Sequence, residues 1–269
     1  MASNEQQRRA RFLAAYDAQL RGDAEVPDAL TVDVLGPLRL ATFAGGNGFV
    51  TYRDLGGLQA DAIRRLVPEV VDFFRNRPEV DHVEWKTRAH DEAPGLVEAL
   101  TENDFVPDDP ESIMIGEAAA LAVEVPLPDG VTLRRVTDEP SARAMTAMQG
   151  EIFGDPVSDA RADALVQRLS LDDGMELWVA EADGVIVTAG RIDPVPDSDF
   201  AGIWGGATRP EWRGRGIYRA LTAARARSAL ARGKTLINSD STEFSRPILE
   251  RSGFLAVSTT TPYTWTRPA

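Results

Sequence analysis

The stretch TRPEWRGRGIYRAL, residues 208–221, decides how the second half of this 269-residue chain folds. A run typical of a strand, residues 200–208, precedes it, and a turn with a proline follows. Gly214 and Gly216 then lead directly into a predicted helix over residues 216–231. The start of such a helix presents unpaired main-chain N–H groups and the positive end of the helix dipole. The stretch therefore predicts an anion site, best suited to a phosphate group.

Two familiar kinds of phosphate loop do not match this stretch. A Walker loop requires Gly-x4-Gly-Lys-Ser/Thr, which the sequence lacks. A dinucleotide fingerprint requires a small residue where Arg219 stands. The pattern that remains is Arg-x-x-Gly-x-Gly/Ala, which here reads Arg213, Gly216 and Tyr218. The other arginines of the predicted helix are more simply a solvated face than contacts to a further phosphate of the ligand: Arg219, Arg225, Arg227 and Arg232.

In motif and in the order of predicted elements, residues 131–268 resemble the GNAT superfamily of acyl-CoA N-acyltransferases. A later block of that family matches Asn238, Ser245 and Gly253-Phe254. The resemblance implies acetyl-CoA or another acyl-CoA as co-substrate, with its diphosphate on the main chain of the loop and its pantetheine along the preceding strand. The cofactor-binding residues that it implies are Ala207, Thr208, Arg213, Gly214, Arg215, Gly216, Ile217, Tyr218 and Asn238.

The chain departs from the family pattern at two positions. Tyr218 is bulky where the loop usually ends in a small residue, and Leu249 stands where the family often has a tyrosine that protonates the leaving thiolate. Ser245, Tyr218 or water are the alternative acids, and Asp240 is a candidate general base. We name Ser245 and Asp240 as candidate catalytic residues, against the alternatives of helix capping and of a solvated loop carboxylate.

Three acidic residues lie near the predicted acceptor pocket. By the resemblance, Glu151, Asp155 and Asp159 lie in the loop that shapes the acceptor pocket, where they hold a cationic amine or are ordinary surface charges. The net charge of −13 favours a cationic acceptor in the same way.

The first half of the chain predicts a second unit with the same order of elements as the second half: a hairpin, a long helix and a strand. A hairpin around Gly45-Gly46-Asn47, an amphipathic helix over residues 59–75 and a strand over residues 82–87 precede a Pro- and Gly-rich linker at 126–130. We therefore predict an α/β fold, of the α+β mixed-sheet kind, with two GNAT-like units in tandem, residues 1–125 and 131–269. The first unit is degenerate, because Asp54 in the segment RDLGGL would repel a diphosphate.

Composition narrows the function further. The net charge of −13 disfavours a nucleic-acid or anionic-membrane partner. The chain has no cysteine and two histidines, which excludes a thiolate nucleophile and a histidine-rich metal centre, and we expect no metal. A polar N-terminus and the lack of a long apolar run predict a cytoplasmic protein, monomer or homodimer.

The predicted function is transfer of an acetyl or other short acyl group from acyl-CoA to a primary amine of a small molecule or peptide. Because the chain has no cysteine, the amine would attack directly in a ternary complex. The alternatives are a non-catalytic CoA-binding sensor or scaffold, and a transferase that uses another acyl donor such as aminoacyl-tRNA, which the negative charge disfavours.

Overall fold

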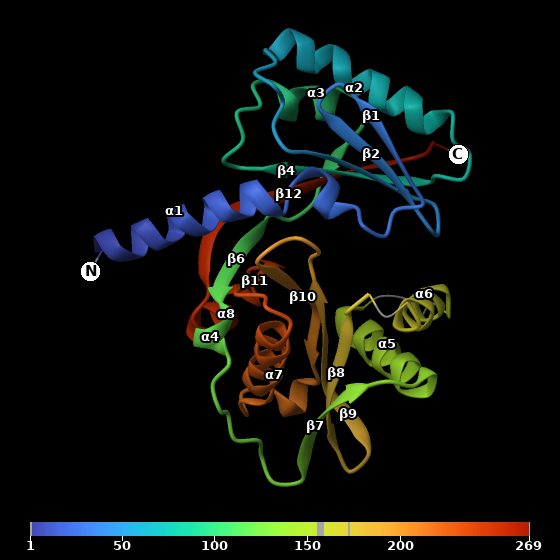
Figure 1. Cartoon of the computed structure of the whole chain (residues 1–269). Helices are drawn as coiled ribbons and strands as arrows, with labels where there is room; N and C mark the ends of the chain where they lie inside the picture. The colour runs from blue at the N-terminus through green and yellow to red at the C-terminus, as the bar shows by residue number, and fades with distance from the viewer. Residues whose placement is uncertain (1, 155–158, 172, 269) are drawn as a thin grey trace. The chain divides into compact units, whose positions relative to one another are not determined.

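The computed structural model describes residues 2–154, 159–171 and 173–268 (Figure 1). Its contacts divide the chain into two compact units. Unit 1 comprises Met1–Met114, Asp240–Pro247 and Ala256–Ala269, and unit 2 comprises Ile115–Ser239 and Ile248–Leu255. This differs from the two continuous domains predicted from the linker at 126–130, because the last strand of the chain pairs with a strand of unit 1.

Unit 1 is a mixed sheet with the strand order β1-β2-β3-β4-β12, and β5 pairs with β12. The pair β3–β4 is parallel and the other pairs are antiparallel. Its elements are α1 (Ala2–Gln19), η1 (Gly22–Glu25), β1 (Thr31–Leu35), β2 (Leu38–Phe43), β3 (Asn47–Tyr52), α2 (Ala60–Arg75), β4 (His82–Arg88), α3 (Leu96–Glu102), β5 (Val106–Pro107) and β12 (Leu255–Thr266). Helix α2 buries the apolar stripe that its sequence predicts.

Unit 2 has the strand order β11-β10-β9-β8-β7, in which only β10–β11 is parallel among the described pairs. The unit boundary crosses β6, β11, α8 and the start of β12. The remaining elements are β6 (Glu111–Glu117), α4 (Ala118–Leu121), β7 (Val131–Val136), α5 (Glu139–Phe153), α6 (Asp159–Leu169), β8 (Glu176–Ala182), β9 (Val185–Pro194), β10 (Phe200–Thr208), η2 (Pro210–Trp212), α7 (Ile217–Ala231), β11 (Leu236–Ser241) and α8 (Arg246–Ser252).

Helices cover both faces of the sheet in unit 2 (Figure 1). On β8, Leu177 and Val179 pack in the cluster that contains residues of α5 and α6. Ala180 and Ala182 belong to a separate cluster with Ile217 of α7. Because successive residues of a strand point to opposite faces, α5 and α6 lie on one face and α7 on the other.

The two units share one arrangement of elements, as the similar order of predicted elements in the two halves of the sequence indicates. A hairpin, a long helix and a strand parallel to the second hairpin strand occur as β2-β3-α2-β4 and as β9-β10-α7-β11. The mixed α/β fold is therefore confirmed. The alanine run at 118–121 forms the short helix α4, because alanine favours helix. No helix among the described residues combines the length and apolarity needed to cross a membrane.

Candidate functional site

The predicted phosphate loop joins β10 to α7 across exposed surface. Residues 213–216 are exposed, and Gly216 is the N-cap of α7. Gly214 and Gly216 have φ values of +74° and +79°, left-handed conformations that suit glycine. A Cβ added to either glycine would meet nothing within 4 Å. The main chain of this loop is therefore open to an approaching ligand.

The first turn of α7 carries main-chain donors that no helical bond satisfies. The N–H of Ala220 donates to the carbonyl of Gly216 over 3.0 Å, which is the first bond of the helix ladder. The N–H groups of Ile217, Tyr218 and Arg219 precede that bond, and no side chain caps the helix. These donors and the positive end of the helix dipole form a site suited to an anion.

Arg213 and Arg215 place positive charge beside those donors. The Nε of Arg213 donates to the carbonyl of Thr208 over 3.1 Å, and within the described residues its Nη groups have no acceptor. The guanidinium of Arg215 lies 4.8 Å from the centre of the Trp212 ring. Both arginines are exposed, so their charge is available to an anion at the loop.

Strand β10 is partly unpaired on its β11 side within unit 2. Its parallel ladder with β11 ends at Gly202, opposite Asn238. Its antiparallel pairing with β9 continues to Thr208, through a bulge between Trp204 and Ala207. The Thr208 carbonyl already accepts from the loop, and the other main-chain groups of this edge can pair with an extended ligand. The structure thus brings the predicted strand residues and the predicted loop together.

Asn238 lies where the ladder between β10 and β11 ends. Its side chain is buried, with 6% of the residue exposed, and its Oδ1 has no hydrogen-bond partner among the described residues. A buried acceptor without a donor is costly. This orphaned oxygen is what a ligand with N–H groups in the gap would satisfy.

Tyr218 turns its ring toward the β10 bulge. A Cβ added to Gly206 would lie 2.6 Å from the Tyr218 Oη and 2.7 Å from its Cε2, so the ring packs directly on that glycine. The bulky residue of the loop pattern therefore points into the sheet, and its main-chain N–H stays on the helix end.

Arg225 is a polar residue whose place the sequence analysis missed. It is fully buried, and its Nη1 donates to the carbonyl of Arg191 over 3.1 Å. Burial lowers the pKa of Arg225 below its usual value. Reading Arg225 as part of a solvated helix face was wrong, and its spacing of four residues from buried Leu221 is the signal that could have indicated it.

The predicted catalytic residue Asp240 is part of a buried ion-pair network in unit 1. Its Oδ2 accepts from the Nζ of Lys86 over 2.8 Å, and 11% of its side chain is exposed. Burial by itself would lower the pKa of Lys86, but the charges of Asp240, Tyr16 and Glu25 raise it above the usual value. Asp240 is thus a paired carboxylate rather than a solvated loop residue. A catalytic role for it stays a prediction.

Ser245 also belongs to unit 1 and precedes α8. Its Oγ donates to the carbonyl of Thr242 over 3.3 Å, a local turn contact. Leu249 of α8 is buried, with 1% exposed. The position at which the family often has a tyrosine therefore holds a core side chain in this protein. Its catalytic role stays a prediction.

The acidic residues predicted around the acceptor have separate roles. Glu151 forms an ion pair with Arg209 over 3.0 Å. Asp159 is the exposed first residue of α6, and Asp155 lies outside the described residues.

The equivalent loop in unit 1 is closed by its own carboxylate. The Asp54 side chain accepts from the N–H of Gly56 over 2.8 Å. A main-chain donor that could face an anion is therefore taken, and a negative charge lies beside it. That the first unit binds no cofactor stays a prediction.

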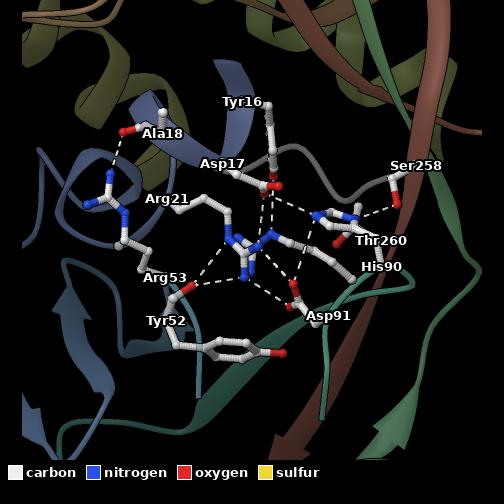
Figure 2. A network of polar contacts seen from close by, with 12 residues as sticks. Tyr16, Asp17, Ala18, Arg21, Tyr52, Arg53, His90, Asp91, Ser258 and Thr260 are labelled. Carbon is white, nitrogen blue, oxygen red and sulfur yellow. Dashed lines mark hydrogen bonds and ion pairs between the residues drawn. The ribbon is translucent and has the colours of Figure 1, made fainter. Parts of the chain in front are cut away.

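A second polar network in unit 1 surrounds Arg21 (Figure 2). Arg21 pairs with both oxygens of Asp91, at 2.8 and 3.0 Å, and with Asp17 at 3.0 Å. His90 contacts Asp17 through Nε2 at 3.0 Å and Ser258 through Nδ1 at 2.6 Å. The contacts Ser258–His90–Asp17 join the residue types of a catalytic triad, but Asp17 is also ion-paired with buried Arg21. We interpret the network as the support that fixes the end of α1 on the sheet.

Glu176 of β8 joins its strand to α7. It is 3% exposed and accepts from Ser228 at 2.6 Å, from the Trp178 Nε1 at 2.9 Å and from Arg232 at 3.0 Å. Burial would raise the pKa of Glu176, but these hydrogen bonds outweigh it and lower the pKa below the usual value. Trp178 is half-buried and lines a cavity of about 570 Å³.

Comparisons with known proteins agree with this geometry. Residues 142–254 match the model of the acetyltransferase (GNAT) family. A comparison with proteins of curated function gave no match.

Solved structures show the same fold over nearly the whole chain. A GCN5-related N-acetyltransferase from Kribbella flavida is 17% identical, with a TM-score of 0.69, covering 97% of this chain and 96% of that one. A tandem GNAT protein from the clavulanic acid biosynthesis pathway is 15% identical, with a TM-score of 0.62, covering 86% and 79%. A GCN5-related N-acetyltransferase from Sphaerobacter thermophilus is 18% identical, with a TM-score of 0.61, covering 87% and 78%. At these identities the likeness concerns the fold, and it includes a tandem arrangement.

Proposed function

We propose that this protein transfers an acetyl or other short acyl group from acyl-CoA to a primary amine, since residues 142–254 match the model of the acetyltransferase (GNAT) family. The acceptor amine belongs to a small molecule or a peptide. The observation that carries the proposal is the exposed loop at 213–216, whose open glycines and free helix-end donors suit a diphosphate.

The residues of unit 2 fit a CoA thioester at three places. The N–H groups of Ile217 and Tyr218, with the charge of Arg213, would hold the diphosphate. The free edge of β10 at Ala207 would pair with the pantetheine, and the orphaned oxygen of Asn238 would accept from one of its amides. When bound, the thioester supplies an electrophilic carbonyl and a thiol leaving group.

The remaining chemistry falls to the chain and to solvent. Main-chain N–H groups at the β10 bulge would polarise the carbonyl, as donors fixed by the fold stabilise developing negative charge. Tyr218 is the tyrosine of unit 2, and its hydroxyl lies beside Gly206 in that bulge, so it is our candidate for a proton donor. A carboxylate or an ordered water would take the amine proton.

One observation favours a second candidate function. The buried Leu249 offers no hydroxyl where the family often has its acid, so a CoA-binding sensor or scaffold without turnover is the alternative. The two functions differ in turnover and share the binding site.

Calorimetric titration with acetyl-CoA and an assay of thiol release over a panel of amines test the proposal together. We expect micromolar binding, loss of binding in Arg213→Glu, and thiol release with at least one amine. Binding without release on any amine would favour the sensor, and absence of binding by the intact protein would refute both functions.

A further inference from the structure

Arg225 of α7 is a buried cation with no opposite charge beside it. The residue is fully buried, and within the described parts of the chain no carboxylate forms an ion pair with it. A guanidinium keeps its charge in a protein, and a buried charge without an opposite charge is costly. Ionisable groups in such surroundings gather at functional sites. The burial of Arg225 therefore indicates a role beyond packing.

Hydrogen bonds connect the guanidinium of Arg225 to β9 and to the first turn of α7. Its Nη1 donates to the main-chain carbonyl of Arg191 over 3.1 Å, and its Nη2 donates to the hydroxyl of Thr222 over 3.3 Å. That hydroxyl donates in turn to the main-chain carbonyl of Tyr218 over 2.9 Å. Arg225 is thus fixed on the sheet and is connected to Tyr218 through one bridging hydroxyl.

The side chain of Tyr218 lies against the same guanidinium. The Cζ of Arg225 is 5.7 Å from the centre of the Tyr218 ring. Burial lowers the pKa of Arg225, whereas a hydrogen bond to the Tyr218 side chain and negative charge on its oxygen favour the charged guanidinium. The interaction is reciprocal, so the guanidinium in turn favours negative charge on the phenol oxygen. Tyr218 itself is half-buried, so part of its side chain is accessible.

Two glycines of the sheet make room for this pair of side chains. A Cβ added to Gly190 of β9 would lie 2.7 Å from the Nη1 of Arg225, and one added to Gly206 of β10 would lie 2.6 Å from the Oη of Tyr218. Both distances are shorter than Cβ contacts in proteins, so each strand requires glycine at this point. The guanidinium therefore packs on β9, and the phenol hydroxyl packs at the β10 bulge, where the thioester carbonyl is proposed to lie.

We infer that Arg225 positions the Tyr218 hydroxyl for proton donation and stabilises the negative charge that the donation leaves on its oxygen. This inference rests on the proposed function, in which Tyr218 is the candidate proton donor. Tyr218 gives its hydroxyl proton to the departing sulfur, which takes the electron pair of the broken carbon–sulfur bond. The proton that the attacking amine loses restores the hydroxyl through solvent, so no proton is gained or lost overall. Arg225 acts through Tyr218 and is therefore a positioning residue.

A double-mutant cycle on turnover tests the inference. Tyr218→Phe keeps the ring and removes the hydroxyl, and Arg225→Gln removes the charge. Arg225→Gln should lower kcat roughly tenfold or more, the effect of one charged hydrogen bond, and leave the Kd for acetyl-CoA near the wild-type value. In the Tyr218→Phe background the same substitution should change kcat little, because the hydroxyl is absent. Arg225→Lys, which keeps a charge, should restore part of the turnover, and Arg251→Gln, an exposed arginine of α8, should keep all of it.

Gly190→Ala gives a second test in which Arg225 stays in the protein. The added Cβ displaces the guanidinium, so kcat should fall when Tyr218 is present and change little in Tyr218→Phe. Urea unfolding without acyl-CoA provides a readout besides turnover. The free energies of unfolding of the wild type, Tyr218→Phe, Arg225→Gln and the double variant give the coupling between the hydroxyl and the guanidinium. We expect Arg225→Gln to destabilise the Tyr218→Phe protein less than it destabilises the wild type.

The outcomes separate the inference from the proposed function. If the wild type releases thiol but Arg225→Gln and Gly190→Ala lower kcat equally in both backgrounds, or in neither, the inference is overturned and the proposed function stands. Additive losses in the unfolding cycle overturn it as well, because the hydroxyl and the guanidinium then do not interact. Absence of thiol release by the wild type with every amine refutes the proposed transfer. A non-additive unfolding cycle in that inactive protein reduces the pair to a structural contact, which also overturns the inference.

Discussion

Substitution of Gly216 by alanine distinguishes the anion loop from an ordinary start of a helix. Gly216 has a φ of +79°, and its added Cβ would meet no atom within 4 Å. The cost to folding is therefore backbone strain alone, about 1–2 kcal/mol for a residue with a Cβ in the left-handed region. Gly216 is, however, the N-cap of α7, so the added methyl group would stand at the helix end that carries the free N–H groups.

The same helix offers a matched control at its other end. Gly233 has a φ of +76°, and a Cβ there also meets nothing within 4 Å. Gly233→Ala should therefore cost about the same free energy of unfolding as Gly216→Ala, again about 1–2 kcal/mol. Only Gly216→Ala should weaken acetyl-CoA binding, because loss of a single charge-assisted hydrogen bond of about 1.5–3 kcal/mol raises Kd roughly 10- to 100-fold.

Two measurements on each variant are required. Urea unfolding gives the free energy of unfolding, and calorimetric titration with acetyl-CoA gives the affinity. If Gly216→Ala binds acetyl-CoA with the wild-type affinity while it is destabilised like Gly233→Ala, the loop is a mere helix entry and the reasoning is wrong. If both variants lose affinity equally, the effect is one of stability and the loop assignment loses its support.

Three further predictions concern stability in urea. Arg21→Met leaves Asp91 buried without its partner and should destabilise unit 1 by about 3–5 kcal/mol. Glu176→Gln should reduce the loss of unfolding free energy that the wild type shows on acidification. The pKa of Glu176 is lowered in the folded state, so its carboxylate stabilises the wild type above the usual pKa of a glutamate, and this stabilisation is lost as the pH falls through the folded pKa. Gly206→Ala forces the Tyr218 ring to move and should cost about 1–3 kcal/mol, an effect that largely disappears in a Tyr218→Ala background.

Each of these has a result that would contradict it. For Arg21, the control is Arg64→Gln, an exposed ion pair expected to contribute no more than about 1 kcal/mol, and similar losses in both variants would refute the buried network. For Glu176, parallel stability profiles of wild type and variant between pH 7 and pH 3 would show that the carboxylate is not held as described. For Gly206, additive effects in the double-mutant cycle would show that glycine and tyrosine do not touch.

Local chemistry explains why the helix start was predictable. The glycines, the arginines and the first turn of α7 lie within a few residues of one another, so their arrangement follows from backbone geometry. The apolar stripe of α2 and the hairpin β2–β3 were predicted for the same reason, because helical and strand periodicity are visible over short windows.

Contacts between distant residues were not visible in the same way. Asp240 lies 154 positions from its partner Lys86, and no local pattern turns a loop carboxylate into half of a buried ion pair. The pairing of β12 with β4 likewise moved the C-terminal strand out of the predicted second domain.

The sequence by itself determined the mixed α/β class, the repeated hairpin–helix–strand pattern and the loop that suits a diphosphate. Only the tertiary structure decided that Arg225 is buried against Tyr218, that Asp240 is ion-paired, and that Gly190 and Gly206 from neighbouring strands make room for the arginine and the tyrosine. The physical reason is that a loop or a helix end is stabilised by neighbours in the chain, whereas the surroundings of a buried charge depend on elements that only packing brings together.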